Sequence, residues 1–357
     1  MPTLYVAITN HGFGHATRTA SVVAEIQKQL PDLLVILATT APRWLLESYL
    51  PGDFIHRHAA FDIGIIQSDS VTMDKAATLA KLQQIRTEQF SMIAREATFL
   101  QQNRVDLVLA DIPPLATAIA QAAHLPCWMI SNFGWDFIYR PWGGAFVEMA
   151  DWIAECFSRC DRLFRLPFHE PMSAFPHITD VGLTGGTPHT DITTLREKFQ
   201  ITAPPEQTIL LTFGGLGLDQ IPYPTLQRFT DWQFITFDRQ APDLPNLLKI
   251  TDPYYRPVDF MPLCSRVVSK PGYSTFAEAC RMDTPIISIT RDDFAESPIL
   301  LSGIQDHMPH QVLSPPDFFH SNWEFLEHPL QPPRTQQKVS KDGNLAITQA
   351  VLDYFTS

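Results

Sequence analysis

The chain of 357 residues lacks the long apolar segments that mark membrane proteins. No apolar run reaches the roughly 18 residues that a transmembrane helix requires. The N-terminus, Met1–Val6, has neither the basic stretch nor the long apolar stretch of a signal peptide. We therefore expect a cytoplasmic protein and leave peripheral contact with a membrane open.

Basic residues are also scarce, because 26 Lys and Arg stand against 38 Asp and Glu, a net charge of −12. Such a chain repels a polyphosphate backbone unless its basic groups cluster, and they do not. A nucleic-acid partner is therefore not expected.

Metal-ligating patterns are missing as well. The five cysteines are odd in number and lack metal-ligand spacing, which argues against a disulfide framework or a zinc site. Cys156 and Cys160 are spaced to share a helix face, where we expect small core residues. The chain has no Asp-x-Asp triplet, which argues against a metal-dependent nucleotide-sugar site. We expect no metal and no cofactor.

Short apolar runs alternate with helical patterns along most of the chain. This alternation predicts parallel sheets covered by helices, and the length predicts two domains. We expect an α/β protein with Rossmann-like domains at 1–175 and 176–340, and a helix at 341–357 that packs back on the first. The predicted strands are Thr3–Thr9, Leu33–Ala38, Asp106–Ala110, Cys127–Ser131, Thr208–Phe213, Phe234–Phe237, Arg266–Ser269 and Pro285–Thr290, and the clearest helices are Leu79–Gln102, Leu115–Ala123 and Leu345–Phe355.

The segment Asn10–Arg18 follows the first strand and opens a helix. Its glycines, Gly14 among them, allow a tight turn and a close approach of backbone to ligand. The positive end of the helix dipole lowers the pKa of His15 and favours its neutral, base-competent form. The alternative is a purely structural turn, against which the second histidine, His11, argues.

Asp111 ends the predicted strand that neighbours this segment. Since parallel strands end at one edge of a sheet, its carboxylate can hold the far nitrogen of His15 and stabilise the imidazolium. Alternatively, Asp111 caps a turn or the next helix.

Two segments of the second half can bind a phosphate. The amides of Gly214–Gly217 follow a buried strand, although a tight connection is the alternative. At Lys270–Glu278, Thr275 and Glu278 fit a helix capping box. The functional alternative places phosphate oxygens at Ser274 and Thr275, and ribose hydroxyls at Glu278.

Two further patterns have either a purely structural or a functional interpretation. The acidic run Arg291–Glu296 either binds sugar hydroxyls or forms a solvated loop. The aromatic run Phe133–Trp152 either packs in the core or forms a lip for an acceptor or a membrane face.

Six segments together resemble GT-B glycosyltransferases of the group that contains MurG and the plant secondary-metabolite enzymes. More narrowly, they resemble the glycosyltransferase-like N-terminal region of plant L-arabinokinase and its bacterial stand-alone relatives. The segments are HGFGHATR (His11–Arg18), QSDSVTMD (Gln67–Asp74), SNFGWDFIY (Ser131–Tyr139), RLPFHEPM (Arg165–Met172), KPGYST with its glutamate (Lys270–Glu278) and RDDFAESP (Arg291–Pro298).

The resemblance implies two Rossmann-like domains whose sheets face a central cleft, and inverting transfer of a sugar from a nucleotide donor, by default a UDP-sugar. The acceptor would be a hydroxyl of a small molecule, lipid or glycan. It implies His15 as catalytic base and Asp111 as its orienting carboxylate. The kinase domain of arabinokinase is absent, so sugar phosphorylation is not implied. The implied donor residues are Gly214, Gly215, Lys270, Gly272, Ser274, Thr275, Glu278, Asp293 and Glu296, and the acceptor-side residues are His11, Gly14, Trp135 and Asp136.

Two alternatives stay open beside the transferase. One is a non-catalytic module that binds a nucleotide sugar, and the other is a UDP-sugar epimerase on the same fold.

Overall fold

The computed structural model of the chain describes residues 1–67, 73–214, 218, 221–291 and 293–356. These residues form two compact units. The first unit holds the described residues up to Thr184 and those from Ser340 on, and the second holds those from Gly185 to Val339. The first unit extends past the predicted limit of residue 175, because β7 (Ile178–Asp180) pairs with β6 (Arg162–Arg165) and completes its sheet.

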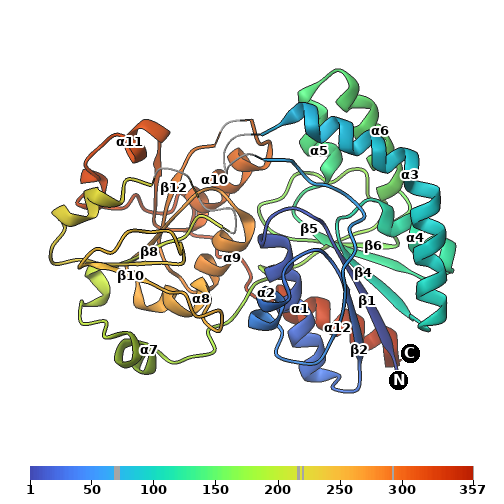
Figure 1. Cartoon of the computed structure of the whole chain (residues 1–357), viewed down its shortest axis with the longest axis horizontal. Coiled ribbons are helices and arrows are strands. Elements are labelled where there is room, and N and C mark those ends of the chain that lie inside the picture. Colours follow the sequence, from blue (N-terminus) through green and yellow to red (C-terminus); the bar gives the residue numbers. More distant parts are fainter. Residues whose placement is uncertain (68–72, 215–217, 219–220, 292, 357) are drawn as a thin grey trace. The chain divides into compact units, whose positions relative to one another are not determined.

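Within the described residues, the sheet of the first unit has seven parallel strands in the order β3-β2-β1-β4-β5-β6-β7 (Figure 1). Its central strands are apolar and buried along their whole length, as expected for a sheet covered on both faces. Besides β6 and β7, the sheet consists of β1 (Thr3–Ile8), β2 (Leu34–Ala38), β3 (Ile55–Arg57), β4 (Leu107–Asp111) and β5 (Cys127–Ser131).

The helices of this unit form two groups. Helix α1 (Gly14–Gln29) contacts α2 (Arg43–Tyr49) and α12 (Gly343–Thr356). Helices α3 (Lys75–Gln102), α4 (Leu115–Ala123) and α6 (Ala145–Phe157) contact one another. The chain runs outward from β1 to β3 and then returns to β4, so right-handed crossovers place the two groups on opposite faces of the sheet (Figure 1). The short α5 (Trp135–Tyr139) and η1 (Arg140–Trp142) precede α6.

Helix α12 returns the chain to the first unit. The Tyr354 hydroxyl donates to the carbonyl of Asp106 (2.9 Å), and the backbone N–H of Leu183 donates to the carbonyl of Ser340 (2.8 Å). At this crossing, a Cβ added to Gly343 would overlap the carbonyl oxygen of Gly182. Glycine is therefore required where the outgoing and returning chains meet.

The second unit contains a parallel sheet with the strand order β10-β9-β8-β11-β12-β13. Its core gathers apolar residues around Phe234 and Trp323, both fully buried. The strands are β8 (Thr208–Leu211), β9 (Gln233–Thr236), β10 (Leu247–Lys249), β11 (Arg266–Ser269), β12 (Ile286–Ile289) and β13 (His310–Leu313). The helices are α7 (Ile192–Phe199), η2 (Pro205–Gln207), η3 (Tyr223–Arg228), α8 (Pro257–Phe260), η4 (Met261–Leu263), α9 (Tyr273–Arg281), α10 (Glu296–His307), α11 (Pro315–Phe319) and η5 (Glu324–Leu326).

Most predicted elements are confirmed, and three agree at both ends: the strands Cys127–Ser131 and Arg266–Ser269 and the helix Leu115–Ala123. The proposed shared helix face of Cys156 and Cys160 is wrong. Helix α6 ends at Phe157, and Cys160 lies in the turn before β6. All five cysteines are buried and free of disulfides, as small core residues.

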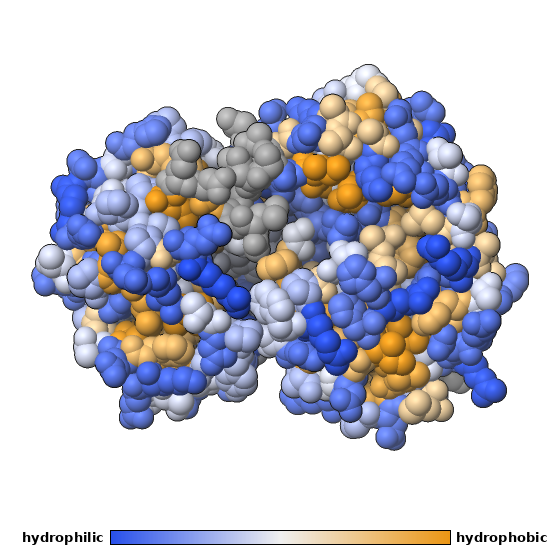
Figure 2. All heavy atoms as spheres, in the orientation of Figure 1, coloured by the Kyte–Doolittle hydropathy of each residue, from blue (hydrophilic) through white to orange (hydrophobic). Residues whose placement is uncertain are grey.

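On the face seen in Figure 2, apolar residues are interspersed with hydrophilic ones. The exposed large apolar side chains include Phe90 on α3 and Tyr254 before α8. No helix in the described part of the chain is long and apolar enough to span a membrane.

The chain crossing at Gly343 generates a stability prediction. We expect Gly343→Ala to lower the free energy of unfolding by about 1–3 kcal/mol, because its new methyl group overlaps the backbone of Gly182. Thermal and urea unfolding measure this loss. The matched control is Gly272→Ala, where a Cβ meets nothing within 4 Å. An equal effect of the two substitutions would contradict the steric argument.

Candidate active site

The first sheet has one topological switch point, between β1 and β4. Chain connections leave this pair of strands in opposite directions, and α/β proteins bind ligands outside the carboxyl ends of strands at such a point. Helix α1 begins at Gly14, shortly after β1 ends, so that His15 lies in its first turn. Asp111 is the last residue of β4 and is paired in register with Ile8. The two predicted catalytic residues therefore both lie at this switch point.

His15 and Asp111 are in direct contact. The imidazole Nδ1 of His15 lies 2.7 Å from Oδ1 of Asp111, and both side chains are buried. The other oxygen, Oδ2, accepts a hydrogen bond from the Thr19 hydroxyl (2.8 Å). The alternative that Asp111 caps a turn or helix is wrong, since its carboxylate binds side chains of α1. Because Nδ1 of His15 is held by Asp111, Nε2 is the ring nitrogen that can take up a proton from another molecule.

Arg18 completes the cluster, and the sequence did not predict it as a site residue. Its Nε donates to Oδ2 of Asp111 and its Nη2 to Oδ1, both at 2.6 Å. Its Nη1 donates to Asn132 (2.9 Å), and Nη2 also reaches the Ser131 hydroxyl (3.2 Å). The signal was present in the sequence, because Arg18 follows His15 by three residues and shares its helix face.

The cluster sets the protonation of both predicted residues. Burial lowers the pKa of His15, the charge of Arg18 lowers it further, and Asp111 acts in the opposite direction. Burial alone would raise the pKa of Asp111, but Arg18 and His15 hold it well below its ordinary value. Both shifts favour a neutral imidazole of His15 beside an ionised carboxylate of Asp111. The lowered pKa was expected from the helix dipole, whereas burial and Arg18 account for it here.

Aromatic rings surround the imidazole of His15. The ring centroid of Trp135 lies 6.2 Å away, and that of Phe133 lies 5.8 Å away. His11 packs edge-on against Trp135 at 5.2 Å, and its Nδ1 accepts the backbone N–H of Ile65 (3.2 Å). The structure thus brings His11 and Trp135 close to His15, and their role on the acceptor side stays a prediction. Phe133 and Trp135 are themselves buried, so this part of the aromatic run packs in the core.

Asp136 is predicted on the acceptor side but contacts its own loop. Its Oδ1 packs against the backbone of Gly134, where a side chain would clash with it. Glu170 accepts the backbone N–H of Gly134 (3.1 Å). Burial raises the pKa of Glu170, and the charge of Asp136 raises it further. The hydrogen bond of Glu170 holds the start of α5, and an acceptor role for Asp136 stays a prediction.

A second buried carboxylate, that of Asp62, binds the residues just before His11 and was not predicted as a site residue. It accepts hydrogen bonds from the backbone N–H of Asn10 (2.7 Å) and from the Thr9 hydroxyl, which in turn accepts Nε1–H of Trp135 (2.9 Å). Burial raises the pKa of Asp62 to about 7, although the bonds from Asn10 and Thr9 oppose the shift. Asp62 therefore fastens the segment that carries His11 and His15.

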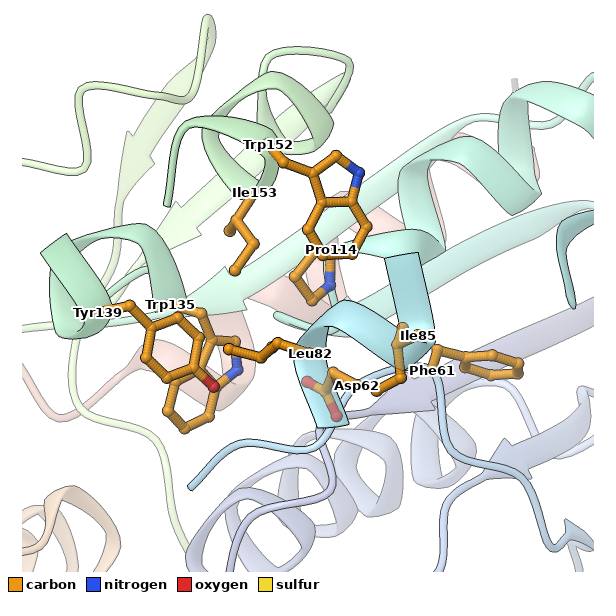
Figure 3. A pocket seen from close by; sticks show the side chains of 9 residues that line it. All are labelled: Phe61, Asp62, Leu82, Ile85, Pro114, Trp135, Tyr139, Trp152 and Ile153. Atoms are coloured by element: carbon orange, nitrogen blue, oxygen red, sulfur yellow. The ribbon is translucent and has the colours of Figure 1, made fainter. Parts of the chain in front are cut away.

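Asp62 also lines a small apolar cavity. The rings of Trp135 and Tyr139 lie nearly parallel beside it, with centroids 5.6 Å apart (Figure 3). Asp62 is the one charged side chain among the nine that line the cavity. The other eight are Phe61, Leu82, Ile85, Pro114, Trp135, Tyr139, Trp152 and Ile153.

The second sheet has its own switch point, between β8 and β11. Gly214 follows β8 with a positive φ of 79°, which only glycine adopts without strain. A Cβ there would lie 3.7 Å from Cε of Lys270, so the two predicted donor residues are neighbours. Gly215 lies outside the described residues. The switch point thus carries a cationic side chain and a glycine turn.

Helix α9 begins at this edge. Gly272 is its N-cap, in an extended conformation, and Tyr273, Ser274 and Thr275 form its first turn. The predicted capping box is wrong, because the helix begins before Thr275, which is its third residue. Glu278 instead accepts the backbone N–H of Gly186 (3.0 Å) and is buried.

The two acidic donor candidates lie near the end of β12. Asp293 is exposed and has a positive φ of 63°, and Glu296 is the buried first residue of α10. Between Arg291 and Asp293, residue 292 lies outside the described part. The binding roles of Glu278, Asp293 and Glu296 remain predictions.

The buried carboxyl of Asp62 generates a prediction about stability and pH. Because the folded state raises its pKa to about 7, the stability contributed by its protonated form is complete below the ordinary carboxyl pKa and is lost as the pH rises through 7. Asp62→Asn stays neutral at every pH. The free energy of unfolding is measured with urea at about pH 5 and at about pH 8. The fall of this free energy between the two pH values should be smaller in Asp62→Asn than in the wild type by roughly 2 kcal/mol.

The matched control is Asp32→Asn, which makes the same change at an exposed turn. It should leave the pH dependence of unfolding as in the wild type. If Asp62→Asn also leaves it unaltered, the carboxyl of Asp62 does not titrate in this range.

Comparisons with known proteins agree with this architecture. No known protein-family profile matches the chain. L-arabinokinase from Arabidopsis thaliana is 30% identical over 310 residues, which are 84% of this chain and 29% of that protein. The chain therefore spans less than a third of this relative's length.

Solved structures match over the full length of the chain at low identity. CalG4, the calicheamicin glycosyltransferase, superposes with a TM-score of 0.61 at 14% identity and covers 100% of this chain and 99% of its own. UGT2 of Phytolacca americana, solved with UDP-2-fluoro-glucose and pterostilbene, has a TM-score of 0.59 at 12% identity and coverages of 99% and 94%. A UDP-N-acetylglucosamine 2-epimerase, so assigned by similarity, from Listeria monocytogenes has a TM-score of 0.59 at 13% identity and coverages of 100% and 97%.

The two parallel sheets, each with a switch point of its own, are those of known glycosyltransferases. The chain has the two-domain GT-B glycosyltransferase fold and is related in sequence to L-arabinokinase.

Proposed function

We propose that the protein transfers a sugar, with inversion, from a nucleotide-diphosphate donor to an acceptor hydroxyl. The observation that carries the proposal is the imidazole of His15, held at Nδ1 by the buried Asp111 at a topological switch point. The lowered pKa of His15, caused first by burial, supports it. A UDP-sugar is the proposed donor, as in the UDP-2-fluoro-glucose complex of the structural neighbour UGT2.

His15 acts as general base in the proposed reaction. Its Nε2 takes the proton of the acceptor hydroxyl while the hydroxyl oxygen bonds to the anomeric carbon. The bond from that carbon to the diphosphate oxygen breaks, and the diphosphate leaves with the electron pair. A single displacement of this kind inverts the anomeric centre. Asp111 stabilises the imidazolium that forms.

The second unit is the proposed donor-binding unit. The ammonium of Lys270 and the first turn of α9 both complement a diphosphate, one by its charge and the other by its N–H groups and helix dipole. We also assign Gly214 and Gly215 to the binding of the diphosphate. Gly272, Ser274 and Thr275 are assigned to its phosphate oxygens, and Glu278 is assigned to the ribose. Asp293 and Glu296 are assigned to the hydroxyls of the donor sugar.

The acceptor side is assigned to the first unit, at His11, Gly14, Trp135 and Asp136. The aromatic surroundings of His15 favour an acceptor with an apolar or sugar ring beside its hydroxyl. A small molecule, a lipid and a glycan all fulfil this condition. The proposed reaction takes place in the cytoplasm and requires neither a metal ion nor a cofactor.

A nucleotide-sugar epimerase is the second candidate, and the structural match to a UDP-N-acetylglucosamine 2-epimerase favours it. An epimerase converts a nucleotide sugar without an acceptor. A binding module that lacks a reaction is the third candidate.

Substitution of His15 tests the transferase. A thermal-shift screen of nucleotide sugars first identifies the donor, since a ligand at about 100 times its Kd stabilises by about 2.7 kcal/mol. Release of nucleotide diphosphate is then measured with pools of acceptors. We expect His15→Ala to lower the rate by about 10²–10⁴-fold, because the base is lost, with donor affinity by calorimetry unchanged.

The control is His58→Ala, which removes an exposed imidazole. It should release diphosphate at the wild-type rate. Equal turnover in wild type and His15→Ala would overturn the assignment of His15. Conversion of a UDP-sugar alone, followed by NMR of the sugar, would identify an epimerase, and binding without any turnover would identify a binding module.

A further inference from the structure

The carboxylate of Asp111 is shared among three side chains, those of His15, Arg18 and Thr19. Each of its oxygens accepts two hydrogen bonds, Oδ1 from His15 and Arg18, and Oδ2 from Arg18 and Thr19. These four bonds fill the acceptor capacity of a carboxylate. The bidentate guanidinium already balances the charge of Asp111 in a fully buried place. Protonation of His15 would therefore set a second buried cation beside this one carboxylate, which is less favourable than an imidazolium that has the carboxylate to itself.

The contact with Asp111 decides which nitrogen of His15 carries the proton. Nδ1 lies 2.7 Å from Oδ1 of Asp111, and an ionised carboxylate only accepts hydrogen bonds. Nδ1 is therefore the protonated nitrogen, and it donates to Asp111. Nη2 of Arg18 lies 2.9 Å from the same Nδ1, so the cation stands directly beside this N–H group. The two hydrogens of Nη2 have acceptors in Oδ1 of Asp111 (2.6 Å) and in the hydroxyl oxygen of Ser131 (3.2 Å).

We infer that Arg18 is a positioning residue that keeps His15 uncharged, with its lone pair on Nε2, and that Ser131 supports Arg18 in this place. The inference deepens the proposed function and takes its catalytic meaning from it. Without Arg18, the imidazolium would be the one cation bonded to Asp111 and would be favoured. Without Ser131, Nη2 would lose one of its acceptors, and Arg18 would be held less firmly beside the imidazole.

The other groups around His15 do not replace Arg18. From β4 the imidazole faces Asp111, and from the segment before α1 it faces His11, with ring centroids 6.2 Å apart. From α5 and the residues before it, the uncharged rings of Trp135 and Phe133 face it. Among the groups named here, Arg18 is the cation in hydrogen-bonding distance of both His15 and Asp111. Burial and Arg18 both lower the pKa of His15, in accord with this geometry.

The protonation state is observable without any substrate. The test uses the full chain with ¹⁵N-labelled histidines and multiple-bond ¹H–¹⁵N correlation spectra, with the signals of His15 identified as those missing in His15→Gln. We expect a neutral ring at neutral pH, protonated at Nδ1. A ring protonated at Nε2, or an imidazolium, would overturn the inference. This result is independent of turnover, so it stands apart from the fate of the proposed function.

Two variants locate the cause. In Arg18→Met we expect the pKa of His15 to rise above its wild-type value and the acidic limb of the pH–kcat profile to move to higher pH. The control is Arg43→Met, which breaks an exposed ion pair with Glu47 (2.7 Å) and should change neither. If Arg18→Met titrates like the wild type, Arg18 does not set the charge of His15.

Ser131→Ala keeps the size of a small buried side chain and tests the support of Arg18 if Arg18→Met does not fold. We expect the pKa of His15 to rise above its wild-type value and the acidic limb of the pH–kcat profile to move with it, while the neutral ring stays protonated at Nδ1. A merely structural role of Ser131 would leave the pKa of His15 unmoved, and that result would overturn its part in the inference.

Discussion

The buried ion pair between Arg18 and Asp111 is the interaction on which the candidate site depends. It joins the first turns of α1 to the end of β4, and the bonds of Arg18 to Asn132 and Ser131 extend it to the end of β5. Burying two charges is unfavourable unless every hydrogen bond is made, and in this cluster the carboxylate makes four. The hydrogen bonds of Arg18 thus hold three chain segments together at the switch point, and the imidazole of His15 is oriented by its contact with Asp111.

A second buried carboxylate, that of Asp62, also holds the site by hydrogen bonds. Asp62 binds Thr9 and Asn10, the residues that follow β1, and Thr9 binds the indole of Trp135. The pKa values of the two acids are shifted in opposite directions for a physical reason. Burial would raise both, but Arg18 and His15 lower the pKa of Asp111, whereas no cation is among the causes that shift Asp62, and burial together with the charge of Asp111 raises its pKa to about 7. The environment of each acid therefore decides its role.

Local sequence patterns predict the two-unit α/β fold, because buried parallel strands are apolar runs bounded by turns. The strands that were missed are β3, β6, β7, β10 and β13. Two of them, β6 (RLFR) and β7 (ITD), carry polar side chains, and pairing within the sheet rather than propensity makes them strands. The pairing of His15 with Asp111 was predictable, since both lie at strand ends. The spacing of Arg18 from His15 places both on one helix face, but burial and long-range partners give Arg18 its role, and a single sequence does not reveal these. The sequence around Asp62 has no such pattern.

The close approach of Gly182 and Gly343 marks where the chain of the second unit is inserted into the first. The second unit is an insertion into the first, since its chain leaves after Thr184 and returns before Ser340. The two attachment points are tied by the hydrogen bond between Leu183 and Ser340. A linker of a few residues can therefore bridge them, and excision of the inserted unit leaves the sheet and helices of the host, α12 included, topologically complete.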